Sequence, residues 1–376
     1  MLLGITGCFG LLPHRFAIAS QPTIQLTTEP SIGKVLPFKA GSHYPQTPVM
    51  LTLQASDGAG QPLKNARIDL QVFTPPQNPW FPTDFPIVEG TQLLELTALA
   101  PTGKLQFQQM LPIRGTYQVR AQVSPVGANA FSPFQQTLTL SVAEHPIKYR
   151  NFAILMVLLL TAGVGGGWIM GGKQSTLSDE VAPERVRLLL SGAIVVAIAA
   201  LLIINISAEV ADSHTNHSPT PRTKTKTPAS VESQDIKLTF TGDESATVGR
   251  PATLAVQARD LKTGKPVTDL IFKVKITEAE DGWVAFAYTG SPNASGQLTW
   301  KQQFFDGAPH KIDVEVSPSS TSTHQFPPMR ISREIEVEGV APPMFTRLIV
   351  LGYFTGVLLL GVGLGLGLKQ KLVEPG

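Results

Sequence analysis

The sequence contains a single cysteine, Cys8, among 376 residues. One thiol excludes an intramolecular disulfide framework and a zinc site built on cysteines. Charge is also scarce and balanced, because 30 basic and 28 acidic residues leave a net charge of +2. No strongly basic segment stands out, so we expect no binding to nucleic acid.

Complete catalytic motifs are missing as well. Neither G-x-S-x-G nor H-E-x-x-H occurs. Fragments at 31–34 and 262–264 match motifs of serine β-lactam enzymes, but they lie in different halves of the chain, with apolar runs between them. The glycines of 361–367 lie inside an apolar run with no strand before them, unlike a dinucleotide loop. We therefore expect a protein that is not an enzyme and holds no cofactor.

Long apolar runs are the most prominent feature that is present. Segments 152–172, 188–206 and 348–368 each contain no Lys, Arg, Asp, Glu or His. A helix needs roughly 20 apolar residues to cross the hydrocarbon core of a bilayer. The sequence therefore predicts three transmembrane helices and a multi-pass protein of the plasma membrane.

The first residues, 1–20, are expected to be a signal peptide or an uncleaved N-terminal anchor. Ala17 and Ala19 form the small-x-small pattern of a cleavage site, although the usual basic residues are missing. Cys8 follows a lipobox-like sequence, but only seven residues precede it, which is too few for a lipoprotein signal.

The chain contains the same unit twice. Residues 103–125 align with 296–318 without a gap, and an apolar run follows each copy. Within both copies apolar and polar residues alternate, which is typical of strands with one buried face. The sequence thus predicts a mainly β protein: two antiparallel immunoglobulin-like β-sandwich domains, at 22–142 and 235–340, plus three transmembrane α-helices.

The connecting segments complete the expected organisation. Residues 207–233 are rich in Ser, Thr and Pro, and they predict an extended tether. Two spans separate the modules, so both modules lie on one side of the membrane, which we take as extracytoplasmic. The loop 173–187 and the tail 369–376 would then be cytoplasmic, as their basic residues favour. The first module alone has a proline-rich insertion, 74–86, expected to be a surface loop with exposed aromatics.

Two groups of residues are candidates for a site. Imidazole and thioether side chains suit copper, and the chain offers His214, His217, His310, His324 and Met329. However, the first two histidines lie in the tether, and His310 aligns with Tyr117, so packed or solvated histidines are the simpler interpretation. Glycines at four-residue spacing predict close helix packing in lipid, namely Gly163, Gly167, Gly171, Gly352, Gly356, Gly361 and Gly365.

Three short features carry a family resemblance. They are D-x-x-T-G-K-P-V at 260–267, a G-x-L strand that starts at Gly296, and A-P-H-K-I at 308–312. In these features each module resembles bacterial immunoglobulin-like envelope domains and is similar to the YtkA-like/FixH group. That resemblance implies small membrane-anchored domains linked to copper and cytochrome oxidase biogenesis.

Taken together, these observations predict a non-enzymatic bacterial envelope protein that scaffolds a membrane complex. Its expected partners are the lipid bilayer and other membrane or envelope proteins, including a second copy of itself. The alternative function is metal handling, as an accessory protein for copper or for oxidase assembly.

Overall fold

The computed structural model describes residues 21–39, 46–127, 131–170, 229–233, 235–320, 322 and 326–373. The first module contains β1 (Thr23–Glu29), β2 (Val49–Ser56), β3 (Ala66–Phe73), β4 (Gln92–Ala100), β5 (Lys104–Gln109), β6 (Gly115–Pro125) and β7 (Phe134–Val142). Two short 3-10 helices, η1 (Ile32–Lys34) and η2 (Pro86–Val88), interrupt its loops.

The second module repeats this strand-rich pattern. It contains β8 (Ala229–Ser233), β9 (Ile236–Gly242), β10 (Ser245–Thr247), β11 (Pro251–Asp260), β12 (Leu270–Glu278), β13 (Val284–Gly290), β14 (Gln297–Gln303), β15 (His310–Pro318) and β16 (Met329–Glu338). As the sequence period predicts, alternate side chains enter the core, for example Tyr117, Val119 and Ala121 of β6. The prediction of a mainly β protein is confirmed.

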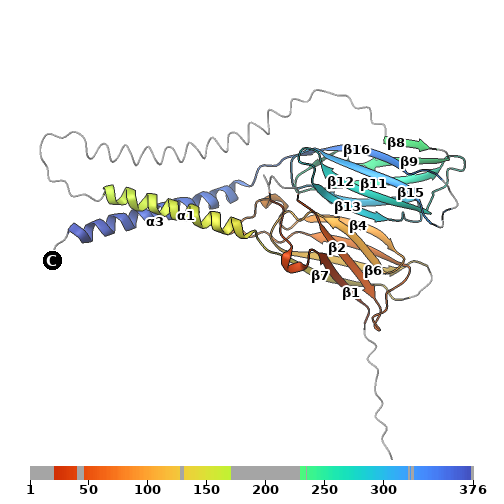
Figure 1. The fold of residues 1–376 in the computed structure, drawn as a ribbon, viewed down its shortest axis with the longest axis horizontal. Coiled ribbons are helices and arrows are strands. Elements are labelled where there is room, and N and C mark those ends of the chain that lie inside the picture. Colours follow the sequence, from red (N-terminus) through yellow and green to blue (C-terminus); the bar gives the residue numbers. More distant parts are fainter. Residues whose placement is uncertain are drawn as a thin grey trace, which may run out of the picture.

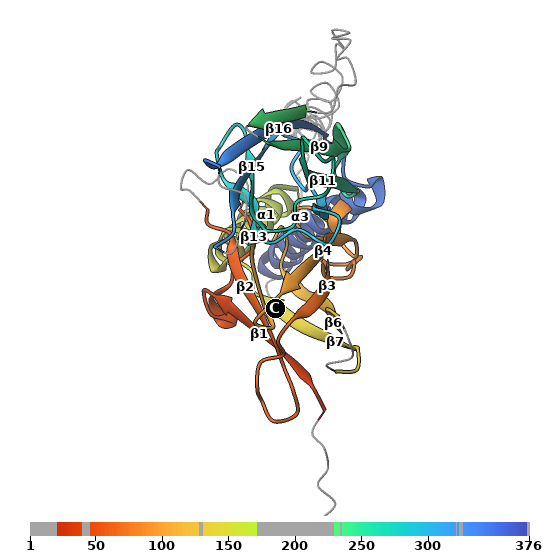
Figure 2. The same ribbon diagram turned by 90° about the vertical axis from the view of Figure 1, so that its right-hand side faces the viewer.

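All of these strands belong to two sheets of eight strands, which face each other as layers. One sheet has the order β1-β2-β5-β13-β12-β15-β16-β10, and the other has the order β7-β6-β3-β4-β14-β11-β9-β8. Figure 2 shows the layers nearly edge on, with β2, β13 and β15 on one side and β3, β4 and β11 on the other. The hydrophobic core lies between them and runs through both modules.

The expectation of two separate sandwiches therefore needs correction. β5 of the first module is hydrogen-bonded to β13 of the second, and β4 is hydrogen-bonded to β14. These four strands would otherwise be exposed edges with unpaired backbone groups, and pairing them removes that cost. The sheets are antiparallel except where β10 pairs in parallel with β16.

Two long helices leave the same end of the sheets (Figure 1). They are α1 (Pro146–Met170) and α3 (Met344–Val373), which pack along each other. Both are long and apolar enough to cross a membrane. They begin earlier than the apolar runs 152–172 and 348–368 that predicted them, because the preceding polar turns are also helical. The third expected span, 188–206, lies outside the described residues, as do 1–20 and the loop 173–187.

Two connecting segments also bear on the sequence-based expectations. The last five residues of the expected tether, Ala229–Ser233, form β8, which pairs with β9 and packs Val231 against the core. The tether assignment is wrong for this part, because Val231 gains burial by pairing. The insertion 74–86 contains no strand and joins β3 to η2, and its Trp80 and Phe81 are largely exposed.

Candidate functional site at the module junction

The two modules join through equivalent strands: β5 and β4 of the first module pair with β13 and β14 of the second. Gln108 of β5 lies opposite Ala287 of β13, and Lys301 of β14 lies opposite Glu95 of β4. In the aligned repeat, Gln108 corresponds to Lys301, so the two contacts are equivalent. The junction therefore has an approximate two-fold relation, with one strand-to-strand contact in each sheet.

Inside the junction, a cluster of aromatic rings crosses from one module to the other. The ring of Phe305 lies 5.2 Å from that of Phe38 and 5.3 Å from that of Phe85, both of the first module. Trp283 packs on the ring of Phe38, and the two ring centroids lie 4.8 Å apart. Three of these four rings are buried, and Phe85 is partly buried against them. The junction is thus a hydrophobic core and not a polar contact between finished domains.

On the outer surface, the two equivalent contacts differ. At the second sheet, Lys301 Nζ lies 3.1 Å from Glu95 Oε2, and Gln92 Nε2 donates to the same oxygen at 2.8 Å. At the first sheet the corresponding pair is Gln108 and Ala287, neither of which is charged. On the second sheet a smaller hollow, of about 270 Å³, borders Glu95. On the first sheet a larger hollow borders Ala287.

This hollow, which we call the junction groove, has a volume of about 380 Å³. It crosses β2, β5, β13 and β12. The residues that line it include Met50, Gln106, Gln108, Lys273, Lys275 and Ala287. Both lysines are exposed, and each lies opposite a carboxylate of β15, Lys273 opposite Glu315 and Lys275 opposite Asp313. The groove therefore offers positive charge and amide hydrogen-bonding groups beside a small apolar floor.

Of the metal candidates, the structure describes only His310 and Met329; His214, His217 and His324 lie outside the described residues. His310 starts β15 and pairs with Ile335, whereas Met329 pairs with Val316 at the other end of the same two strands. Six residues of a strand span about 20 Å, so one ion cannot contact both. Among the described residues, no group of three or more His, Cys, Asp or Glu side chains could hold a metal ion.

His310 has a structural environment instead. Its Nδ1 lies 2.8 Å from the Ala308 carbonyl, and its ring packs against Trp283 and Phe304. Burial lowers the pKa of His310, and it outweighs the opposing effects of the Ala308 carbonyl and of Glu278. The ring is therefore neutral at pH 7.

The aligned residue of the first module, Tyr117, makes a similar contact with its own backbone. Its hydroxyl donates to the Ile113 carbonyl at 2.7 Å and accepts from the Ile113 amide at 3.0 Å. This is the tyrosine-corner contact of immunoglobulin-like sandwiches. His310 thus occupies in the second module the position that a corner tyrosine occupies in the first.

The glycines of the helices fall into two groups. A Cβ added to Gly163 would lie 2.4 Å from the Leu358 carbonyl oxygen, and one added to Gly167 would lie 2.1 Å from that of Val362. Gly361 and Gly365 meet the backbone of α1 equally closely. By contrast, Gly352 and Gly356 have no atom within 4 Å of such a Cβ, and Gly171 lies outside the described residues.

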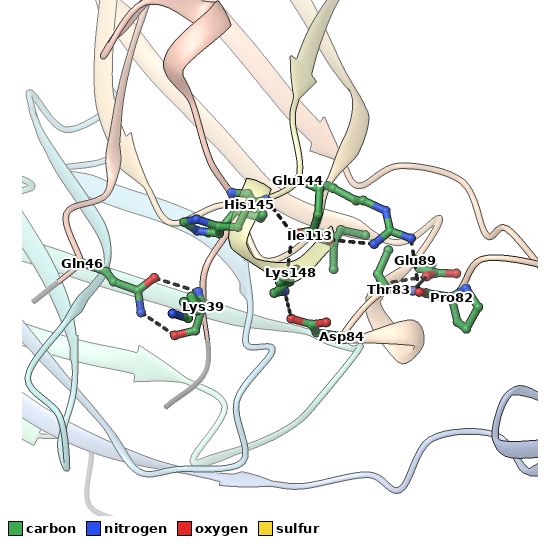
Figure 3. Close-up of polar contacts among 12 residues, drawn as sticks. Lys39, Gln46, Pro82, Thr83, Asp84, Glu89, Ile113, Glu144, His145 and Lys148 are labelled. Carbon is green, nitrogen blue, oxygen red and sulfur yellow. Dashed lines mark hydrogen bonds and ion pairs between the residues drawn. The ribbon is translucent and has the colours of Figure 1, made fainter. Parts of the chain in front are cut away.

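A polar cluster fixes the start of α1 to the first module (Figure 3). Arg114 Nη1 lies 2.6 Å from Glu144 Oε2, Lys148 Nζ lies 3.5 Å from Glu144 Oε1, and Lys148 also pairs with Asp84 of the insertion. Partial burial raises the pKa of Glu144. The hydrogen bonds from Arg114 and the His145 amide, together with the nearby cations, lower this pKa by more, so the net shift is downward. The cluster borders a cavity of about 520 Å³.

Sequence reasoning missed the junction groove and this polar cluster. The groove depends on pairing between modules, and each module looks complete when its pattern is read separately. One signal was present: Lys301 replaces Gln108 in the aligned repeat, so the two outer faces carry different charges.

No family model and no curated protein sequence matches this chain, so the resemblance to the YtkA-like/FixH group gains no support. Among solved structures, a copper-bound variant of FetP from uropathogenic Escherichia coli is 12% identical; the match covers 30% of this chain and 97% of that chain, with a TM-score of 0.23. The adhesin InvE from Yersinia pseudotuberculosis is 10% identical over 84% of this chain and 60% of its own, with a TM-score of 0.20.

Alpha-2-macroglobulin from Escherichia coli is 12% identical over 85% of this chain, which spans only 16% of that protein, with a TM-score of 0.22. Such low TM-scores support no conclusion about what this chain binds or does.

Proposed function

We propose that this chain is a non-enzymatic, multi-pass protein of the bacterial envelope, whose two immunoglobulin-like modules form one extracytoplasmic docking platform. Two continuous sheets and a shared aromatic core hold the modules together. Two closely packed helices long enough to span a membrane support its anchoring. The platform would thus keep one orientation relative to the bilayer, as a scaffold requires.

The observation that carries this proposal is the junction groove. It lies where the two modules meet, so it exists only when they are paired. The equivalent hollow on the other sheet is smaller, about 270 Å³, and its lining includes Asp69 and Glu95. A partner side chain entering the groove would occupy the position that Glu95 occupies on the opposite face.

The partner is proposed to be another envelope protein that presents an acidic side chain on an extended segment. Lys273 and Lys275 would face its carboxylate, and the amides of Gln106 and Gln108 would offer hydrogen bonds. Complementary charge of this kind favours encounter and fixes the register of a contact.

Site-specific photo-crosslinking in native membranes tests this proposal. A photoreactive side chain in place of Gln106 should form an adduct with a partner protein, and Ala287→Glu should abolish that adduct by filling the groove. Thr299→Glu is the matched control, because it adds the same charge to the outer face of the other sheet. Absence of an adduct at Gln106, or an adduct that survives Ala287→Glu, would contradict docking at the groove.

Sidedness needs a separate experiment. After the outer layer of intact cells is made permeable, protease should remove both modules and leave the 173–187 loop uncut. Protection of either module would overturn the proposed topology.

A further inference from the structure

The insertion 74–86 reaches from the first module to the side of α3. The Tyr353 hydroxyl of α3 donates to the Trp80 carbonyl at 2.7 Å. The rings of Phe81 and Tyr353 are stacked, with centroids 6.4 Å apart and an interplanar angle of 12°. A loop of the β module therefore lies directly against a helix that is apolar enough to cross a membrane.

Several polar contacts hold this loop in place. Asn78 Oδ1 accepts hydrogen bonds from the amides of Trp80 and Phe81, at 3.0 and 3.1 Å. At its far end, Glu89 Oε1 accepts from the Thr83 amide and hydroxyl, at 2.9 and 2.7 Å. The loop is thus a fixed support for its two aromatic residues.

Those two aromatic side chains nevertheless remain largely exposed. Trp80 is 67% exposed and Phe81 is 64% exposed, although both are large and apolar. The loop carries one charged side chain, that of Asp84, which is paired with Lys148 at the start of α1. An ordered, nearly uncharged loop that displays a tryptophan and a phenylalanine calls for an apolar partner.

The position of the loop along α3 identifies this partner. Tyr353 lies five residues after Leu348, where the apolar run begins. Helical side chains point back toward the N-terminus of their helix, so the Tyr353 hydroxyl and the Trp80 carbonyl lie near the start of that run. This is the depth at which tryptophan and tyrosine gather at membrane–water interfaces.

The second module contains no counterpart. Its corresponding connection, between β12 and β13, is short, and its Trp283 is buried in the junction. Within the part of the chain that the structure describes, this contact with the side of α3 is made by the first module.

We propose that the insertion 74–86 is a membrane-docking loop, with Trp80 and Phe81 embedded in the interfacial layer of the bilayer beside α1 and α3. This inference rests on the proposed crossing of the membrane by those helices. The loop would fix the tilt of the platform, because it adds an off-axis contact with lipid to the two helical anchors. The energetic gain comes from removing both apolar rings from water at a depth where the indole N–H of Trp80 can still form a hydrogen bond.

Tryptophan fluorescence of the full chain in liposomes tests the docking directly. The chain has four tryptophans, of which Trp283 and Trp300 are buried in the β core. In a Trp168→Phe variant, the quenchable signal reports Trp80; in a Trp80→Phe variant, it reports Trp168 within α1. The double variant supplies the baseline. The probe is phosphatidylcholine brominated near the carbonyl end of its acyl chains, with aqueous acrylamide as the opposing quencher.

We expect the brominated lipid to quench Trp80 strongly and acrylamide to quench it weakly. Quenching of Trp168 but not of Trp80 by brominated lipid, with Trp80 open to acrylamide, would overturn the docking loop and leave the membrane anchor standing. The exposed aromatics would then suit a protein partner. If neither tryptophan is quenched by lipid, the membrane crossing itself fails.

Discussion

Gly163 of α1 and Gly361 of α3 contact each other reciprocally: a Cβ built on either one would lie 3.0 Å from the Cα of the other. One turn further along, a Cβ built on Gly365 would lie 3.0 Å from the Cα of Gly167. Small residues at such spacing let helix backbones approach closely, which is the main source of helix association in lipid. The two helices of one chain thus pack as a pair.

Replacement of Gly361 by leucine should separate the helices. The new side chain would meet the Leu160 carbonyl oxygen, which lies 2.5 Å from its Cβ position. Overpacking of this kind costs about 1–3 kcal/mol. Cross-linking between cysteines placed on α1 and α3, in a Cys8→Ser background, should therefore fall.

Gly363→Leu provides the matched control, since no atom lies within 4 Å of its Cβ position. Insertion should survive in both variants, because leucine is at least as apolar as glycine. Equal cross-linking in the two variants would mean that the glycine contact does not hold the helices together.

Phe305→Ala should weaken both modules at once. Phe305 packs on rings from each module, and truncation of a buried phenylalanine costs about 3–5 kcal/mol. Thermal unfolding followed by hydrogen exchange should show β3 and β15 losing protection together at a lower temperature. Separate transitions for the two modules would contradict a shared core.

His310→Asn should remove a pH dependence of stability. Because burial lowers the pKa of His310 below its ordinary value of 6.5, the unfolded chain binds a proton before the folded one does. The wild type should therefore lose stability as the pH falls below about 6.5, whereas asparagine can keep a bond to the Ala308 carbonyl without titrating. The comparison requires melting temperatures from pH 7.5 to 5; parallel curves would show that His310 is not responsible.

Glu144→Gln tests the polar attachment of α1. The pKa of Glu144 lies below its ordinary value of 4.5, so its contribution to stability is complete above that value and is lost as the pH falls through the folded-state pKa. The glutamine variant should be less stable at pH 7, and its disadvantage should shrink below pH 4.5. Exchange of the amides of residues 144–150 provides the measurement. A disadvantage that does not change with pH would assign the effect to packing.

Most strands could be predicted from the sequence, because a two-residue period reports directly which side chains face the core. The alternation in 117–123, for example, corresponds to β6. The pairing of β5 with β13 could not be predicted, since period alone does not state which strand lies at an edge or what covers it. The strand β8 was missed because its two apolar residues, Ala229 and Val231, stand within a polar segment.

The candidate residues show the same limit. Four-residue spacing marked seven glycines, yet Gly361 meets another helix while Gly356 faces open space. Spacing places residues on a stripe of a helix, whereas contact depends on where the neighbouring helix lies. Similarly, His310 and Met329 are near each other in the sequence but lie at opposite ends of the β15–β16 pair.

Two related modules would ordinarily present two equal binding surfaces. Here the groove on one face is lined by Lys273 and Lys275, whereas the equivalent hollow on the other face is lined by Asp69, Glu95 and Arg120. Under the proposed function, an acidic partner segment would fit the face with the two lysines and not the other, so a titration should reach saturation at an equimolar ratio. The difference in charge between the two repeats would thus set the stoichiometry of the proposed complex.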